Sequence, residues 1–147
     1  MFVQLALGRA LLVVTEMIAA ISIWVMELRF TLLRGWLTRA PHSPKLVLVL
    51  CVAALWVLAQ MTVAIWMWAL TMLALGIFDT LELAVYFALV AFTTLGFGDV
   101  LLPVEWRLLA GMAAANGLLN IGLVTAGMVE TLRQLRIQQM AIQSSDT

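Results

Sequence analysis

Three long apolar segments dominate this sequence and restrict it to a membrane. They run from Phe2 to Leu28, from Leu46 to Phe78 and from Val104 to Val129. A helix needs about 20 apolar residues to cross about 30 Å of hydrocarbon, so each segment is long enough. Apolar residue types make up 65% of the 147 residues and charged types 11%, against roughly 45–50% and 25% in soluble domains. A soluble fold of this size cannot bury so much apolar surface. We therefore predict an all-α membrane protein with three transmembrane helices, and we exclude soluble enzymes and nucleic-acid-binding proteins.

The signs of the charged residues between these segments predict an orientation. The first connection is purely basic, with Arg29, Arg34, Arg39 and Lys45. Short basic connections stay in the cytoplasm, so we expect the N-terminus outside and the C-terminus inside, in the inner membrane of the cell. The second connection is acidic and the chain end is basic, which agrees with this orientation. A cleaved signal peptide is the alternative for the first segment, although that segment is too long and Glu16 interrupts it.

The 24 residues between Phe78 and Pro103 are too few for two more crossings. An apolar helix of about 13 residues, roughly 20 Å long, is predicted over 80–93. Asp79 is the expected N-terminal cap, answered three residues later by Glu82. The chain must then return to the outer side as non-helical backbone, which lipid tolerates only where protein or water covers it. Hydropathy alone therefore predicts a re-entrant loop.

The returning strand reads TTLGFGD from Thr93 to Asp99. This string resembles the selectivity filter of potassium channels, in which backbone carbonyl oxygens replace the water around the ion. Downstream, GLLNIGLVTA at residues 117–126 is similar to the inner helix of bacterial two-helix potassium channels. The resemblance covers residues 46–132. Small bacterial potassium-channel-like proteins with an extra leading span also resemble the chain, more loosely.

The resemblance implies roles for particular residues. The expected ion-binding residues are Thr94, Leu95, Gly96, Phe97 and Gly98, with K⁺ held at Thr94 to Phe97. Thr93 and Asp99 would support this strand, and Gly117, Leu118, Ile121 and Thr125 would line an inner cavity. Successive carbonyls face one axis only if the backbone alternates between ordinary and positive φ, which glycine adopts at low cost. Gly96 and Gly98 supply that alternation.

Two departures from the usual pattern concern the support of the strand. Phe97 replaces a tyrosine, and Tyr86 and Phe87 stand where many relatives have tryptophans. We therefore expect fewer hydrogen bonds around the strand. Val90 occupies a position where some relatives carry a buried carboxylate.

One strand cannot encircle an ion, so the single copy in this chain predicts a tetrameric pore built as a closed homotetramer. Potassium is the expected permeant ligand, and membrane lipids are the other expected partners, with no further cofactor. The chain divides into an N-terminal transmembrane helix (1–28), a basic linker with Pro41 and Pro44 (29–45), a pore domain (46–132) and a cytoplasmic tail (133–147). Within the pore domain we expect an outer helix (46–78), a pore helix (80–93), the filter (94–98) and an inner helix (104–130).

Several polar and aromatic residues within the spans have more than one interpretation. Glu16 has either a functional role or a packing role, in the latter case paired with Arg9, Gln60 or Thr62. Asn116 and Asn120 share a face and either line the cavity or bond across helices. Gly117 matches the hinge glycine of gated relatives, or it permits close helix packing. Tryptophans are expected at both interfaces, Trp24 and Trp36 at the inner one and Trp66, Trp68 and Trp106 at the outer one.

The predicted function is passive, potassium-selective conduction, without bond-making chemistry. A weakly selective cation channel is one alternative. A non-conducting membrane subunit that modulates a partner is another. No span carries arginine at every third position, as a voltage sensor would.

Overall fold

The computed structural model describes residues 2–37 and 42–145, and these residues form helices joined by short connections. Helix α1 runs over Phe2–Leu37, α2 over His42–Ala74, α3 over Leu81–Phe92 and α4 over Arg107–Ser145, with a short 3₁₀ helix η1 at Val104–Trp106. Within the described residues, three helices are long and apolar enough to cross a membrane, over Phe2–Arg29, Val47–Ala74 and Val104–Glu130. The predicted all-α fold with three membrane spans is confirmed.

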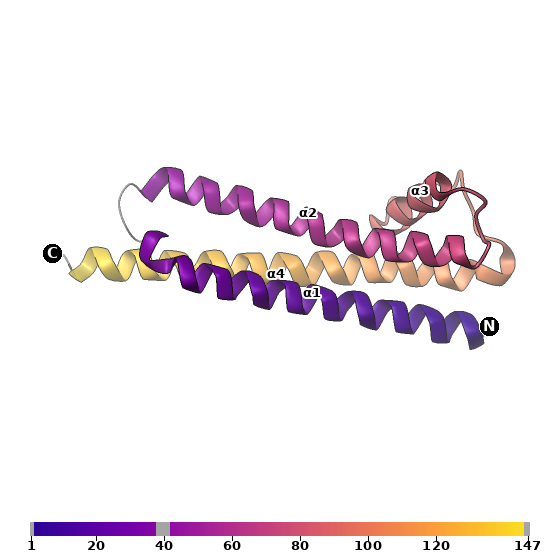
Figure 1. The fold of residues 1–147 in the computed structure, drawn as a ribbon, viewed down its shortest axis with the longest axis horizontal. Coiled ribbons are helices and arrows are strands. Elements are labelled where there is room, and N and C mark those ends of the chain that lie inside the picture. The colour runs from indigo at the N-terminus through magenta and orange to yellow at the C-terminus, as the bar shows by residue number, and fades with distance from the viewer. Residues whose placement is uncertain (1, 38–41, 146–147) are drawn as a thin grey trace.

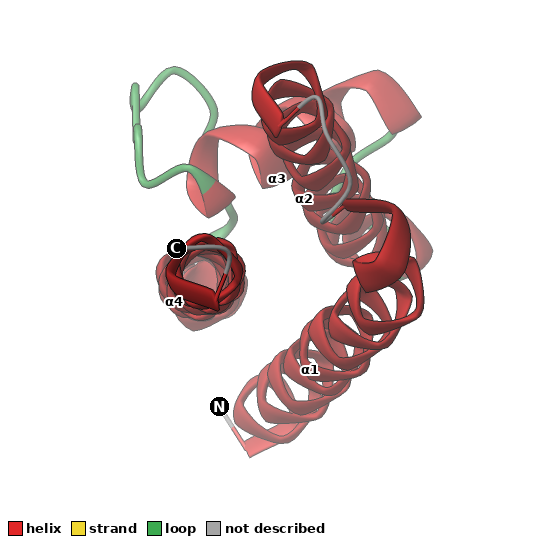
Figure 2. Ribbon diagram, turned by 90° about the vertical axis from the view of Figure 1, so that its left-hand side faces the viewer, coloured by secondary structure: helices red, strands yellow, loops and turns green. Residues whose placement is uncertain are grey.

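The three long helices lie side by side, and α1 and α4 run in the same direction with α2 opposite (Figure 1). The N-terminal end of α1 lies at the same end of the bundle as α3. The C-terminal ends of α1 and α4 lie at the other end. Helix α1 makes its most extensive contacts with α4, while α3 packs between α2 and α4. In the view along α4, α1 and the loop that joins α3 to α4 lie on opposite sides of the bundle (Figure 2).

The helix bounds differ from those expected at both ends of the first connection. Helix α1 continues to Leu37, so residues 29–37 of the expected linker are helical, and Arg39 and Pro41 lie outside the described residues. Pro44 falls in the first turn of α2, where a missing N–H and a φ near −65° are compatible with a helix. At 36 residues, α1 is about 54 Å long, so it tilts or extends beyond about 30 Å of hydrocarbon.

Helix α2 ends earlier and α4 ends later than the apolar pattern predicts. The N–H of Gly76 donates to Leu73 O at 3.0 Å and that of Ile77 to Met72 O at 3.1 Å, and Gly76 has a φ of 66°. These are the bonds and the left-handed residue of a Schellman motif. The apolar residues after it pack against α3, since the rings of Phe78 and Phe87 lie 5.3 Å apart. Helix α4 continues through the expected tail to Ser145.

The core lies where α2, α3 and α4 meet, at the end of the bundle that contains α3. Its fully buried side chains include Trp68, Met72, Phe92 and Leu109. Trp68 was expected at the outer interface and is instead 0% exposed, because its indole lies inside the helix bundle. Trp24, by contrast, is 63% exposed and remains available to the interface.

A close backbone contact joins the end of α3 to the middle of α4. A Cβ atom added to Gly117 would collide with the carbonyl group and Cα of Phe92. These three atoms of Phe92 belong to the backbone, which cannot move aside as a flexible side chain can. The absence of a side chain at Gly117 therefore allows α3 to lie this close to α4. Close helix packing is the interpretation of Gly117 that this contact supports.

We expect the substitution Gly117→Ala to lower the thermal unfolding temperature of the protein in detergent. Overpacking of this kind costs about 1–3 kcal/mol. The matched control is Gly122→Ala in the same helix, where an added Cβ meets no atom within 4 Å. The control should be neutral or slightly stabilising, because alanine favours a helix over glycine. Equal melting temperatures for the two variants would contradict this account of Gly117.

Candidate functional site

Helix α3 begins at a polar cap and is held by its apolar face. Thr80 has extended backbone angles, and its hydroxyl oxygen accepts the N–H of Leu83 at 3.3 Å. Thr80 is therefore the cap, and the expectation of Asp79 in that role was wrong. Because Thr80 is the cap, Glu82 stands at the second helical position, one short of the position that completes a capping box. Ala84, Phe87, Ala88 and Phe92 are the buried residues of this helix.

The end of α3 turns the chain back on itself at Thr94. The N–H of Thr94 donates to Ala91 O at 2.9 Å, and the N–H of Leu95 donates to Val90 O at 3.1 Å. This is the same Schellman motif that ends α2, but the left-handed position holds Thr94, with a φ of 58°, instead of glycine. A side chain in that conformation costs roughly 1–2 kcal/mol. The sequence did not indicate this, since threonine is an unusual residue there.

The strand after this turn has the alternating backbone that the sequence predicted. Gly96 has a φ of 58° and Gly98 a φ of 78°, whereas neither Leu95 nor Phe97 has a positive φ. An added Cβ at either glycine would meet no atom within 4 Å. Backbone conformation, and not crowding within one chain, is therefore what requires glycine at these two positions.

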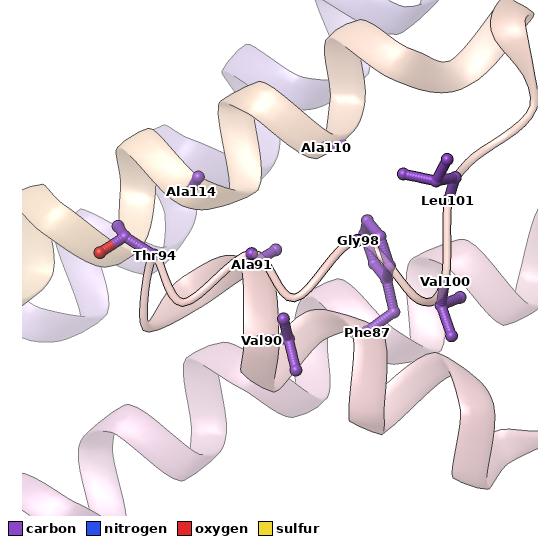
Figure 3. A pocket seen from close by; sticks show the side chains of 10 residues that line it. Phe87, Val90, Ala91, Thr94, Gly98, Val100, Leu101, Ala110 and Ala114 are labelled. Carbon is purple, nitrogen blue, oxygen red and sulfur yellow. The ribbon is translucent and has the colours of Figure 1, made fainter.

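The strand is exposed along one side and borders a hollow on the other. Residues 94–99 are exposed, with Phe97 at 65% and Leu95 at 57% of their full accessible surface. A partly open hollow of about 290 Å³ lies beside the strand (Figure 3). Its lining consists mainly of apolar side chains: Phe87, Val90 and Ala91 of α3, Val100 and Leu101 of the loop, and Ala110 and Ala114 of α4, together with Thr94, Gly96 and Gly98. The surface around the strand is thus apolar, apart from the backbone and Thr94.

A hydrogen bond ties the C-terminal end of the strand to α3. The hydroxyl of Tyr86 donates to the Asp99 carboxylate, with 2.6 Å between the two oxygens. This bond holds the pKa of Asp99 below its usual value and raises the pKa of Tyr86 above its usual value. Fewer hydrogen bonds were expected around the strand because Tyr86 stands where many similar channels have a tryptophan. The tyrosine hydroxyl nevertheless supplies a donor from that position.

The acidic residues near the strand are exposed. Asp79 and Glu82 flank the start of α3, Asp99 ends the strand and Glu105 lies in η1, and all four are accessible. Both connections of α3 lie at one end of the bundle (Figure 1). Arg107 at the start of α4 is the basic residue beside them, so these connections of α3 carry more acidic than basic side chains.

The residues expected to line a cavity separate into two groups. Leu118, Ile121 and Thr125 are exposed and share one face of α4, at helical spacing. Gly117 instead contacts Phe92 at the end of α3. Among the described residues of one chain, this exposed face of α4 is not covered by another helix, so the structure does not test whether it lines a cavity.

The two asparagines of α4 bond across helices. Asn116 and Asn120 are fully buried, and Asn120 Oδ1 accepts the N–H of Gln60 on α2 at 3.2 Å. With its amide oriented so that donors meet acceptors, Asn116 bonds to Thr15 and Glu16 of α1, so Glu16 pairs with an amide and not with Arg9. Of the two interpretations that the sequence left open for these asparagines, bonding across helices is confirmed.

We expect the titration of Tyr86 to report the bond to Asp99 directly, because Tyr86 is the single tyrosine of the chain. The ultraviolet absorbance of tyrosinate should show a midpoint above 10.0 in the wild type, and Asp99→Asn should bring the midpoint back towards that value. Glu105→Gln is the control and should leave the midpoint unchanged.

The pKa directions define the pH range over which this bond supports the fold. The lowered pKa of Asp99 contributes to the free energy of unfolding. This contribution is present above pH 3.8 and is lost as the pH falls through the lowered pKa. The raised pKa of Tyr86 gives a contribution that is present below pH 10.0 and is lost as the pH rises through the raised value. The same tyrosinate midpoint in the wild type and in Asp99→Asn would contradict the bond.

A family model described as an ion channel matches residues 46–134, which include most of α2, all of α3, the strand and most of α4. Helix α1 lies outside the match. No curated protein and no solved structure matches the chain.

Proposed function

Because the chain belongs to the ion channel family, we propose that it forms a potassium-selective pore in which four copies surround one axis. The observation that carries this proposal is the strand Thr94 to Gly98, where positive φ at Gly96 and Gly98 alternates with ordinary φ at Leu95 and Phe97. In the potassium channels that the strand resembles, stacked backbone carbonyls replace the hydration shell of the ion. Carbonyls carry no net charge, so the ion binds and leaves readily.

Helix α3 favours a cation at the inner end of this strand. Its C-terminal end carries the partial negative charge of the helix dipole, and the strand begins directly after it at Thr94. The hydroxyl of Thr94 adds an oxygen at the same place. The exposed acids at the opposite end of the strand would raise the local concentration of cations before they enter.

Four copies are proposed because one strand supplies only one side of an ion site. Leu95 and Phe97 are exposed in a single chain, although both are large apolar residues. The apolar hollow of about 290 Å³ beside the strand suits an apolar side chain of a neighbouring copy. A cyclic arrangement places every strand in the same environment and leaves no unpaired end.

The hydrogen bond of Tyr86 to Asp99 supports selectivity in this proposal. Phe97 has no hydroxyl with which to bond to a neighbouring helix, so the strand depends on other contacts. The bond at 2.6 Å joins Asp99, the residue that follows Gly98, to α3 of the same chain. It would resist widening of the outermost ion site.

The orientation proposed from the basic first connection agrees with the arrangement of the helices. The acidic connections of α3 lie at one end of the bundle, and the C-terminal end of α4 lies at the other (Figure 1). With the basic end in the cytoplasm, the strand opens to the outside. We propose the inner membrane of the cell as its location and passive transport, without catalysis or a further cofactor, as its activity.

We expect purified protein in liposomes to conduct K⁺, and we expect the substitution Gly96→Asp to abolish the flux. The matched control is Gly76→Asp, because Gly76 has a φ of 66° and open surroundings. Both variants force a side chain into the left-handed region, but only Gly96 lies in the strand.

Three outcomes would each change the proposal in a defined way. A reversal potential that follows Na⁺ as closely as K⁺ indicates a weakly selective cation channel. No flux under any condition of pH, lipid composition or membrane tension indicates a non-conducting subunit. A mass in detergent other than that of four copies contradicts the tetramer.

A further inference from the structure

Helix α1 lies outside the part of the chain that matches the ion channel family, yet it packs along α4 at three levels. Near its start, Gly8 lies so close to α4 that an added Cβ would be 2.5 Å from Met112 Sδ. Near its end, a Cβ on Gly127 of α4 would lie 3.1 Å from Ile23 Cγ2. Small residues on each helix therefore allow close contact at both levels, as is typical of helix pairs in membranes.

The central level is polar and fully buried. Thr15 is 1% exposed and Asn116 0% exposed, and the Asn116 amide nitrogen lies 3.0 Å from Thr15 Oγ1. The same nitrogen donates to Glu16 Oε1 at 2.9 Å, and the amide oxygen accepts the indole N–H of Trp68 at 2.7 Å. This orientation of the amide is assigned because only it pairs every donor with an acceptor. Asn116 thus joins α1, α2 and α4 through one side chain.

Thr15 is itself held in place for this contact. Its hydroxyl oxygen lies 2.8 Å from Leu11 O, 3.0 Å from the Asn116 amide nitrogen and 2.7 Å from the amide oxygen. It accepts the amide N–H and shares its own proton between Leu11 O and the amide oxygen. The Asn116 amide therefore directs both of its N–H groups to α1, and its oxygen accepts from Trp68 on α2 and from Thr15 on α1. Loss of either partner on α1 leaves a buried N–H without an acceptor, which is costly in a low-dielectric interior.

Asn116 is next to the residue on which α3 rests. Gly117 follows it in α4, and the Gly117 Cα faces the backbone of Phe92, the last residue of α3. Two residues after Phe92, the chain enters the strand at Thr94. A rotation or shift of α4 at Asn116 therefore moves the support of the pore helix and the inner end of the strand. Because α1 and the strand lie on opposite sides of the bundle (Figure 2), this route passes through α4.

We propose that Thr15 and Glu16 make α1 part of the conduction machinery, in that they hold Asn116 and so set where the pore helix rests on α4. Thr15, Glu16 and Asn116 are positioning residues, since none of them touches the strand. The proposal rests on the proposed function, because it concerns how often the pore conducts. Loss of the contact lowers the fraction of time that the pore is open. In the open state the strand keeps the same arrangement, so the unitary conductance and the K⁺/Na⁺ reversal potential of open channels are unchanged.

Single-channel recording of the full chain in planar bilayers tests this proposal. Thr15→Val, which keeps the shape but removes the acceptor, and Glu16→Ala should each lower the open probability by about fivefold or more, the low end of the usual coupling between linked sites. Thr15→Ser and Glu16→Gln keep an acceptor oxygen and should stay within about twofold of the wild type. Glu16→Ala should have no further effect in an Asn116→Leu background, because both act through the same amide.

The matched control is Ser22→Ala, which removes the hydrogen bond of 2.7 Å from Trp56 Nε1 to Ser22 on α1 without touching α4. It should conduct as the wild type does. A purely structural role would lower the yield and the melting temperature of the tetramer and leave the open probability of assembled channels unchanged.

The outcomes separate this proposal from the proposed function. A wild type that conducts, with Thr15→Val and Glu16→Ala gating normally, overturns the role of α1 and leaves the pore standing. A silent wild type overturns both. If Asn116→Leu does not assemble, the comparison of Thr15→Val with Thr15→Ser decides the question alone.

Discussion

The carbonyl of Phe92 lies against the Cα of Gly117, and no side chain fits between them. This contact fixes the depth at which the short helix α3 ends within the bundle. The Schellman motif that follows depends on it, because Thr94 can bond back to Ala91 only where the helix stops. The backbone alternation at Gly96 and Gly98 begins directly after that turn. The first of the proposed ion ligands, at Thr94, thus lies two residues beyond this backbone contact between α3 and α4.

Hydrocarbon imposes the second condition, since backbone N–H and C=O groups inside a membrane need partners. The long helices satisfy theirs internally. Helix α3 is too short to cross and is covered by α2 and α4, with Phe78 and Phe87 packed together at one side. The strand after it is covered on one side only. Within a single chain the fold is thus complete for its helices and incomplete for the strand, which is the physical reason to propose several copies.

Much of this architecture follows from local patterns in the sequence, and the rest depends on which helices face each other. Hydropathy predicted the three spans, and the spacing of Gly96 and Gly98 predicted their positive φ. The sequence pattern could not predict that Trp68 is buried, because tryptophan suits both a membrane interface and a protein core. Nor could it choose the partners of Asn116, which lie on two other helices. The left-handed Thr94 has no signature in residue type.

The exposure of residues 94–99 has a consequence for how the protein is made. A newly inserted chain that has not met another copy carries uncovered peptide groups at membrane depth. Each such group is costly in lipid, on the order of several kcal/mol. Association with other copies removes this cost, so we expect isolated subunits to be short-lived in the bilayer. In the proposed pore, the peptide oxygens that would face the ion are thus the same groups that association with other copies has to cover.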